Sequence, residues 1–412
     1  MIDKTRLLSH KALMRVFSGG YSNIVLTETI KGASLNETER GFLTRLFYGV
    51  LERKITLEFI LGKFLKSNPP ENVKTALLMG LYQYLYLDSV PEFALVNSSC
   101  ELIGNPKMKG LVNAVLRNAI REGKENLLAS AEEKPNLKYS VSEALYREIK
   151  ASIENETEDF LSSSFTPGPL FIKVNSRLVA PETLIESLNK KGIKAEKTII
   201  PDGLKLEFSG DIVNLEEYKK GLLFTEDLSS QLAVAALGVG ENDLVLDLCA
   251  APGGKSFSAS LKAKEVHSFD IYPQKIESLN QNAKRLSLPV IGAVQSAETA
   301  AGREDKYDKV ICDVPCSGSG VLRRKPEIRF KGETDKSLIA LQRKIMLTAA
   351  ASVKRGGRIL YSTCSVNKKE NDENLNWLLS ENKNLKLIDK KLILPKDYNS
   401  DGFYYAVIER CL

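Results

Sequence analysis

Two cysteines in the C-terminal half stand where they could carry chemistry. Cys316 follows Asp-Val-Pro, and Cys364 follows Tyr-Ser-Thr. Each run continues a short apolar stretch, residues 309–313 and 358–361, of the kind that forms a buried parallel strand. Because open α/β sheets bind ligands at the carboxyl ends of their strands, both sulfurs are expected at that edge of a sheet. The pair is therefore a candidate reactive centre.

Composition limits what these cysteines can be. The chain has 412 residues, 6 cysteines and no CxxC pair or secretory pattern, so we expect free thiols in a reducing cytoplasm. The 2 histidines, His10 and His267, lie away from the cysteine runs, which leaves a Cys-His protease or a metal site without its parts. Because these histidines stand apart, no metal site is expected. No apolar stretch approaches the ~20 residues that span a bilayer, so no membrane span is expected either.

The elements that must position the thiols fall into three regions. Residues 1–135 have helical periodicity throughout, and residues 136–225 suggest linking helices and a small α/β unit of the ferredoxin or RRM-like type. Residues 226–412 alternate strand and helix patterns, which predicts a mostly parallel sheet covered by helices on both faces. The expected strands of that sheet are residues 244–248, 265–270, 289–294, 309–313, 358–362 and 404–409.

A turn of small residues follows the first strand of the third region and runs from Cys249 to Lys255. Such a turn lets backbone approach a ligand closely beside a helix N-terminus. A phosphate-binding P-loop needs glycine where Cys249 stands, and the nicotinamide pattern GxGxxG is absent. S-adenosylmethionine remains as the predicted cofactor, with Asp270 at the end of the second strand placed for its ribose hydroxyls. The alternative is a structural glycine turn and a surface aspartate.

The run from Asp313 to Cys316 replaces a motif of amino-group methyltransferases. Those enzymes place Asp/Asn-Pro-Pro-aromatic at the fourth strand, whereas Asp-Val-Pro-Cys carries a thiol in place of the ring. Carbon 5 of cytosine accepts a methyl group only after a nucleophile adds at carbon 6, and a thiolate suits that addition. Release then needs a second acid or base. Spacing alone does not rank the two thiols, and the alternative for each is a buried small hydrophobe, as for Cys312.

Several runs together resemble the RNA cytosine-C5 methyltransferases. They are residues 249–256, 313–320, 362–365, Glu370-Asn-Asp-Glu373 and Asp401–Ala406. The N-terminal region, with Val112-Asn-Ala-Val-Leu-Arg117, is similar to the antitermination factor NusB, so the whole chain resembles the B-type bacterial 16S ribosomal RNA cytosine-C5 methyltransferases. The resemblance implies a NusB-like RNA-binding domain over residues 1–135, linker helices and a small domain over 136–225, and a Rossmann-like methyltransferase domain over 226–412.

The same resemblance implies roles for individual residues. Cys364 would add to carbon 6, and Cys316 would help to release the product. Asp313 and Lys255 would complete the catalytic set. The implied cofactor contacts are Cys249, Ala250, Ala251, Pro252, Gly253, Gly254, Lys255, Asp270 and Asp313, with Glu298 as a stand-in for an aspartate that the family has after the third strand.

The expected activity is transfer of a methyl group from S-adenosylmethionine to carbon 5 of one cytosine in 16S ribosomal RNA, naked or in an early assembly intermediate, by a monomer. Two alternatives stay open: the same chemistry on transfer RNA or 23S RNA, and a non-catalytic RNA-binding assembly protein. Basic residues of the first region, among them Arg15, Arg53 and Lys54, could contact phosphates or form an ordinary solvated surface, which the net charge of +6 does not decide.

Overall fold

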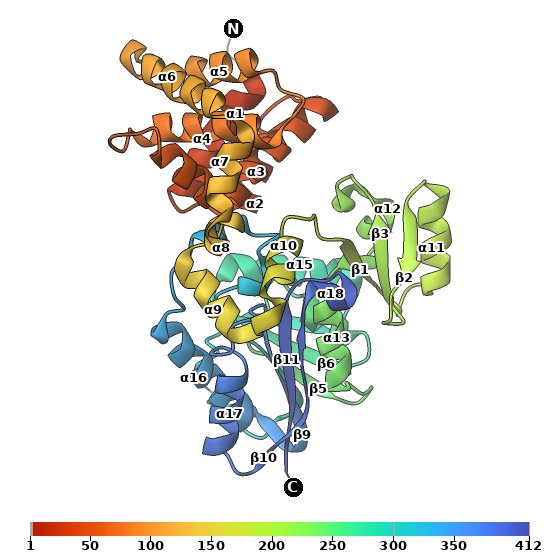
Figure 1. Ribbon diagram of the computed structural model, residues 1–412. Helices are drawn as coiled ribbons and strands as arrows, with labels where there is room; N and C mark the ends of the chain where they lie inside the picture. Colours follow the sequence, from red (N-terminus) through yellow and green to blue (C-terminus); the bar gives the residue numbers. More distant parts are fainter. Residues whose placement is uncertain (1–2, 300, 412) are drawn as a thin grey trace. The chain divides into compact units, whose positions relative to one another are not determined.

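The computed structural model describes residues 3–299 and 301–411, which form two compact units (Figure 1). The helical unit comprises the chain up to Lys150 together with Leu322–Glu333. The α/β unit comprises Ala151–Val321 and Thr334–Leu412. A short segment from the middle of the predicted third region therefore folds with the N-terminal helices.

The helical unit packs its helices around one apolar core. In α3 (Glu37–Gly62), Leu46 and Phe47 are fully buried, and they share that core with Leu77 of α4 (Glu71–Tyr86). The other helices of the unit are α1 (Lys4–Phe17), α2 (Ser22–Lys31), α5 (Glu92–Glu101), α6 (Pro106–Glu122), α7 (Lys124–Glu132) and α8 (Pro135–Lys138), and α9 (Glu143–Ile153) begins in this unit and ends in the α/β unit. The all-helical prediction for this region is confirmed, because the apolar stripes fall on one face of each long helix.

The inserted segment Leu322–Glu333 is held by hydrogen bonds inside the helical unit. Ser22 donates its hydroxyl to Glu327 at 2.7 Å, at the start of α2. Arg329, whose side chain is fully buried, donates from Nη1 to the carbonyl of Tyr139 at 2.9 Å. A buried guanidinium needs such partners, so this segment is a fixed part of the unit.

The small domain of the α/β unit is a four-stranded antiparallel sheet in the order β2-β3-β1-β4. Its strands are β1 (Leu170–Val174), β2 (Lys194–Lys197), β3 (Gly203–Glu207) and β4 (Leu223–Thr225). Ile172 and Leu204 of the sheet pack against Leu184 and Leu188 of α11 (Pro181–Lys190). The predicted small α/β unit is therefore present; α10 (Thr157–Ser163) precedes it, and α12 (Glu216–Lys219) leads into β4.

The large sheet has seven strands in the order β10-β11-β9-β8-β5-β6-β7. Neighbouring strands from β9 to β7 run parallel, whereas β11 pairs antiparallel with both β9 and β10. The strands are β5 (Leu244–Asp247), β6 (Glu265–Asp270), β7 (Val290–Val294), β8 (Tyr307–Asp313), β9 (Val353–Thr363), β10 (Leu385–Ile393) and β11 (Phe403–Arg410). All were expected from the sequence except β10.

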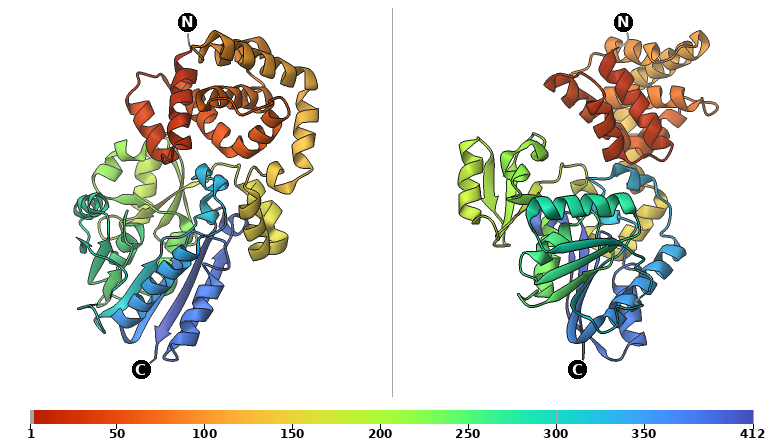
Figure 2. Two further views of the ribbon diagram at one scale, coloured as in Figure 1. Left: turned by 90° about the vertical axis from the view of Figure 1, so that its left-hand side faces the viewer. Right: turned by 180° about the vertical axis from the view of Figure 1, so that it is seen from behind.

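Helices cover both faces of this sheet. One core contains α13 (Leu228–Leu237), α14 (Gly254–Ser260) and α15 (Pro273–Leu286). The other contains α16 (Lys336–Ser352) and α17 (Asp372–Glu381), which appear as blue helices along the sheet in Figure 2. Successive residues alternate between the two cores: Val245 lies in the first and Leu246 in the second. This two-sided burial explains the continuous apolar strands. Within the described residues, every helix is too short or too polar to cross a bilayer.

Candidate active site

The two thiols meet at the carboxyl ends of neighbouring strands. Strands β8 and β9 run parallel with Asp313 opposite Ser362, and Cys316 and Cys364 lie just beyond these positions. Their Sγ atoms are 3.1 Å apart. This distance exceeds the ~2.05 Å of a disulfide bond, so the pair consists of two free thiols in contact. The expectation that both sulfurs emerge at one sheet edge is confirmed.

The surroundings of Cys316 favour its protonated form. Its hydrogen bond with Cys364 raises the pKa of the Cys316 thiol well above its ordinary value, and burial and the charge of Glu370 add to this. At neutral pH, Cys316 therefore stays a thiol, and its S–H can donate a hydrogen bond to the sulfur of Cys364. Burial also raises the pKa of Cys312, which lies inside the second core as the small hydrophobe that its sequence suggested.

Lys255 and Asp313 form a partly buried ion pair beside the thiols. Lys255 Nζ lies 2.8 Å from one carboxylate oxygen of Asp313, and Ser362 donates its hydroxyl to the other oxygen at 2.7 Å. Burial lowers the pKa of Lys255, but the charge and hydrogen bond of Asp313 outweigh burial, and the pKa is raised. The lysine therefore stays an ammonium group and cannot act as a general base; it fixes and balances the carboxylate instead.

The turn from Cys249 to Gly254 joins β5 to α14 at the same edge of the sheet. Gly253 has φ +116°, and a Cβ there would lie 2.5 Å from the ring of Phe257, so this position needs glycine. Ala250 donates its backbone N–H to the carbonyl of Phe269 at 2.8 Å, which ties the turn to β6. Burial and nearby carboxylates raise the pKa of Cys249, which therefore remains a thiol.

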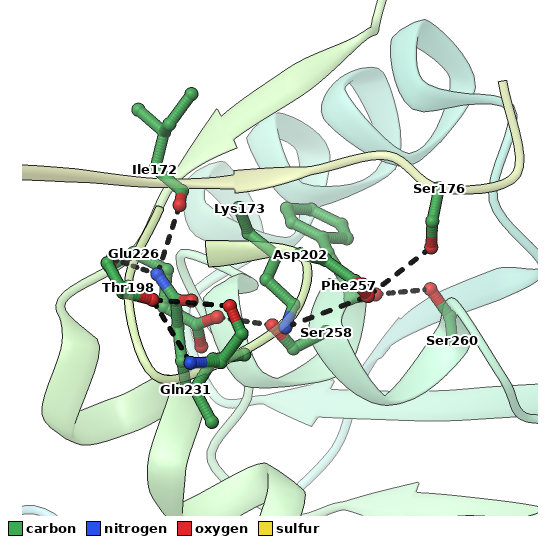
Figure 3. A network of polar contacts seen from close by, with 11 residues as sticks. Ile172, Lys173, Ser176, Thr198, Asp202, Glu226, Gln231, Phe257, Ser258 and Ser260 are labelled. Carbon is green, nitrogen blue, oxygen red and sulfur yellow. Dashed lines mark hydrogen bonds and ion pairs between the residues drawn. The ribbon is translucent and has the colours of Figure 1, made fainter. Parts of the chain in front are cut away.

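Two buried carboxyl groups next to this turn were not among the predicted site residues. Asp247 accepts a hydrogen bond from Ser256 at 2.6 Å. Glu226 accepts one from Ser258, and both of these residues are labelled in Figure 3. Burial is the main cause that raises the pKa of each to about 7. One oxygen of each carboxyl, Oδ1 and Oε1, has no hydrogen-bond partner among the described residues. Such orphaned atoms beside the turn fit a ligand that carries an ammonium group, as S-adenosylmethionine does.

Gln231 of α13 connects the backbone of Glu226 to strand β1 of the small domain. Gln231 donates from Nε2 to the carbonyl of Ile172 at 3.2 Å and to that of Glu226 at 2.9 Å. In Figure 3, Lys173 of β1 points toward Asp202, and the ion pair between them measures 3.9 Å.

The position of Asp247, at the end of a strand before a glycine turn, could have indicated from the sequence that it belongs to the site. Nothing in the local sequence of Glu226 could have done so.

The two acids predicted to bind the cofactor, Asp270 and Glu298, differ in their surroundings. Asp270 is buried at the end of β6 and accepts a hydrogen bond from the backbone of Tyr272 at 3.0 Å. Glu298 lies on the surface, with its side chain 48% exposed and 3.4 Å from Lys344. The structure therefore brings Asp270 to the sheet edge where the turn lies, and places Glu298 in a solvated ion pair.

The Asp401-Gly-Phe run at the start of β11 contacts the loop of Cys316. Gly402 donates its N–H to the carbonyl of Gly320 at 2.9 Å, and Gly320 donates to the carbonyl of Cys364 at 3.0 Å. A Cβ on Gly320 would lie 2.0 Å from the oxygen of Gly402. Phe403 completes the contact, since its ring centroid lies 4.9 Å from Lys255 Nζ. The run is therefore part of the site.

In the helical unit, three of the basic residues that could contact phosphates or form an ordinary solvated surface have partners inside the unit. Arg15 pairs with Glu28 at 2.5 Å, and Lys54 pairs with Glu58 at 2.8 Å. The guanidinium of Arg53 lies 4.9 Å from the ring centroid of Tyr86. Internal contacts account for these three side chains.

Three family models match successive regions of the chain. Residues 234–409 match the family described as 16S rRNA methyltransferase RsmB/F, residues 3–121 match the NusB family, and residues 142–213 match the ferredoxin-like domain of RsmF/B-like methyltransferases. A relative from Bacillus subtilis (strain 168), named probable ribosomal RNA small subunit methyltransferase B, is 32% identical over 95% of both chains.

Solved structures share this fold. One, titled PH0851, covers 100% of both chains with a TM-score of 0.85 at 24% identity. Another, NSun6 from Pyrococcus horikoshii crystallised with SFG, covers 66% of this chain and 99% of its own with a TM-score of 0.61 at 19% identity.

Proposed function

Because the chain belongs to the 16S rRNA methyltransferase RsmB/F family, we propose that it transfers a methyl group from S-adenosylmethionine to carbon 5 of a cytosine in 16S ribosomal RNA. The observation that carries the proposal is the 3.1 Å contact between two free thiols, next to the Lys255–Asp313 pair. Methylation at carbon needs a nucleophile and a separate acid or base. This pair of thiols can supply both.

In the first step, the Cys364 thiol loses its proton to solvent, the resulting thiolate bonds to carbon 6 of cytosine, and the electrons of the C5=C6 double bond move toward carbon 5. The family resemblance assigns this addition to the cysteine of the Thr-Cys-Ser run, which is Cys364. Cys316 can stabilise a thiolate on Cys364 by donating an S–H across the 3.1 Å contact. When bound, S-adenosylmethionine supplies the electrophilic methyl group.

Asp313 would orient the base during these steps. Lys255 and Ser362 already hold its two oxygens, and a carboxylate has about four lone-pair positions, so it can accept a further hydrogen bond from the cytosine edge. The orphaned oxygens of Asp247 and Glu226, with the Cys249–Gly254 turn and Asp270, would hold the cofactor.

Release reverses the addition. The proton on carbon 5 leaves to a base, the C5=C6 double bond forms again, and the bond between carbon 6 and Cys364 breaks. The Cys364 sulfur leaves with the electrons of the broken bond, and Cys316 is placed to donate its S–H proton to that sulfur, since the two sulfurs lie 3.1 Å apart. Without it, the covalent protein–RNA adduct should persist.

The test uses single cysteine variants with RNA and S-adenosylmethionine. Cys364→Ala should lose methylation, whereas Cys316→Ala should accumulate a covalent adduct visible on a denaturing gel. Cys411→Ala is the matched control, because Cys411 is an exposed free cysteine away from the site. Wild-type methylation by Cys364→Ala would refute the nucleophile assignment.

Bisulfite sequencing of RNA from a deletion strain identifies the target. Loss of one 5-methylcytosine in 16S RNA is the expected result. A loss in 23S or transfer RNA instead would keep the chemistry and overturn the proposed substrate.

A further inference from the structure

A buried glutamate connects the two thiol loops. Glu370 is fully buried in the segment between β9 and α17. One carboxyl oxygen, Oε1, accepts hydrogen bonds from the backbone N–H of Ser317 at 2.8 Å and from Gln342 Nε2 at 2.9 Å. The other oxygen, Oε2, accepts from the hydroxyls of Ser317 at 2.5 Å and Ser365 at 2.6 Å. The carboxyl group therefore accepts four hydrogen bonds.

The donors are the immediate neighbours of the thiols in the chain. Ser317 follows Cys316, and Ser365 follows Cys364. The two hydroxyls also lie 3.1 Å from each other. Each loop thus has a hydrogen bond to the same oxygen at the residue next to its sulfur.

Gln342 of α16 holds the other side of the Cys316 loop. Its Nε2 donates to the carbonyl of Pro315 at 2.9 Å as well as to Glu370, and its Oε1 accepts from Asn374 of α17 at 2.8 Å. Cys316 is therefore fixed from both sides, through the residue before it and the residue after it.

We propose that Glu370 is a positioning residue that clamps the Cys316 and Cys364 loops together and thereby keeps their sulfurs in contact. This inference rests on the proposed use of both thiols in the reaction. Glu370 acts only through Ser317, Ser365 and Gln342 and need not touch the RNA. Displacement of a reacting group by about 1 Å can slow an enzyme about 100-fold, which is the loss expected if the clamp is removed.

A glutamine at this position separates hydrogen bonding from charge. Its carbonyl oxygen can accept hydrogen bonds from the Ser317 N–H and from Gln342 Nε2, because both of these groups can only donate. Its amide can donate to the two serine hydroxyls, which can reverse their roles. Glu370→Gln should therefore preserve the clamp, whereas Glu370→Ala removes it. Glu381→Ala, at the exposed end of α17, is the matched control.

The first measurement needs no RNA. Dibromobimane becomes fluorescent when it has linked two thiols, and mass spectrometry identifies the Cys316–Cys364 product. The initial rate of this cross-link should fall about tenfold in Glu370→Ala and stay near wild type in Glu370→Gln and Glu381→Ala, because the clamp sets the effective concentration of one thiol beside the other. An unchanged rate in Glu370→Ala, or an equal loss in Glu370→Gln, would overturn the proposal.

The second measurement is the kinetics of methylation. In Glu370→Ala we expect kcat to fall about 100-fold with KM for RNA changed less than about threefold, and Glu370→Gln should recover at least about tenfold of that loss. A loss confined to KM would overturn the positioning role, because it would show weakened RNA binding in place of misplaced thiols.

If Glu370→Ala does not fold, the double variant Ser317→Ala/Ser365→Ala removes both hydroxyl donors and leaves the carboxyl group. It should slow the cross-link severalfold, and an unchanged rate would refute the clamp. The cross-link result is independent of methylation. A slower cross-link with unchanged kcat would support the clamp and refute the catalytic use of the thiol pair, which Cys364→Ala tests separately.

Discussion

Substitution of Glu226 by glutamine should change how stability depends on pH. Glu226 is buried, and burial raises its pKa to about 7 from the ordinary 4.5, although Ser258 and the charges of Lys255 and Lys173 oppose the shift. The folded state therefore holds a proton that the unfolded chain has already lost between pH 4.5 and 7. Over this window, the free energy of unfolding falls as pH rises.

The size of the effect follows from the two pKa values. They differ by about 2.5 pH units, and each unit corresponds to about 1.4 kcal/mol, so Glu226 removes about 3 kcal/mol of stability between pH 4.5 and pH 7 or above. Glutamine resembles the protonated carboxyl group and does not titrate. The variant should therefore gain about 3 kcal/mol relative to wild type over the same range.

The assay is urea unfolding at pH 5, 6, 7 and 8. The chain has 1 tryptophan, Trp377 in α17, so its fluorescence reports unfolding of the domain that contains Glu226. Asp247, whose pKa burial also raises, is present in both proteins and cancels in the difference. Glu241→Gln, at an exposed position, is the control. Parallel pH dependences for wild type and Glu226→Gln would refute the reasoning.

Other substitutions test other parts of the structure. Lys255→Met should slow methylation about 100-fold, because it removes the partner that lies 2.8 Å from Asp313, and single-turnover rates that match wild type would contradict this. Gly320→Ala should lower the free energy of unfolding by about 2 kcal/mol, since its Cβ would lie 2.0 Å from the oxygen of Gly402. Urea unfolding followed by Trp fluorescence measures this, and an unchanged urea midpoint would show that the loops adjust freely. Arg329→Ala should destabilise the helical unit by about 3 kcal/mol, because it leaves a cavity at a fully buried position and removes a hydrogen bond. Thermal unfolding followed by circular dichroism measures this loss, and an unaltered melting temperature would contradict the prediction.

Local patterns were sufficient for most of the sheet and for the place of the thiols. Strands β5, β6, β7, β8, β9 and β11 were expected from short runs bounded by turns, although β9 begins at Val353, five residues before the expected start at residue 358. Strand β10 was missed: Leu385–Ile393 contains three lysines and an aspartate that interrupt any apolar run. It is the edge strand of the sheet, where charged residues are common because one side has no neighbouring strand.

The amino-acid sequence by itself was enough to predict a methyltransferase sheet and the edge of that sheet where the two thiols lie. Cys316 and Cys364 were expected at one edge of the sheet because each follows a parallel strand, and the pairing of β8 with β9 then brought them into contact. Folding alone decided which side chains surround them. Glu370 reaches both thiol loops, Glu226 is buried beside the cofactor turn, and Leu322–Glu333 joins the helical unit, through contacts between residues far apart in the chain. Such contacts leave no periodic signal, since burial and hydrogen bonding to distant partners depend on the packed structure and not on neighbouring residues.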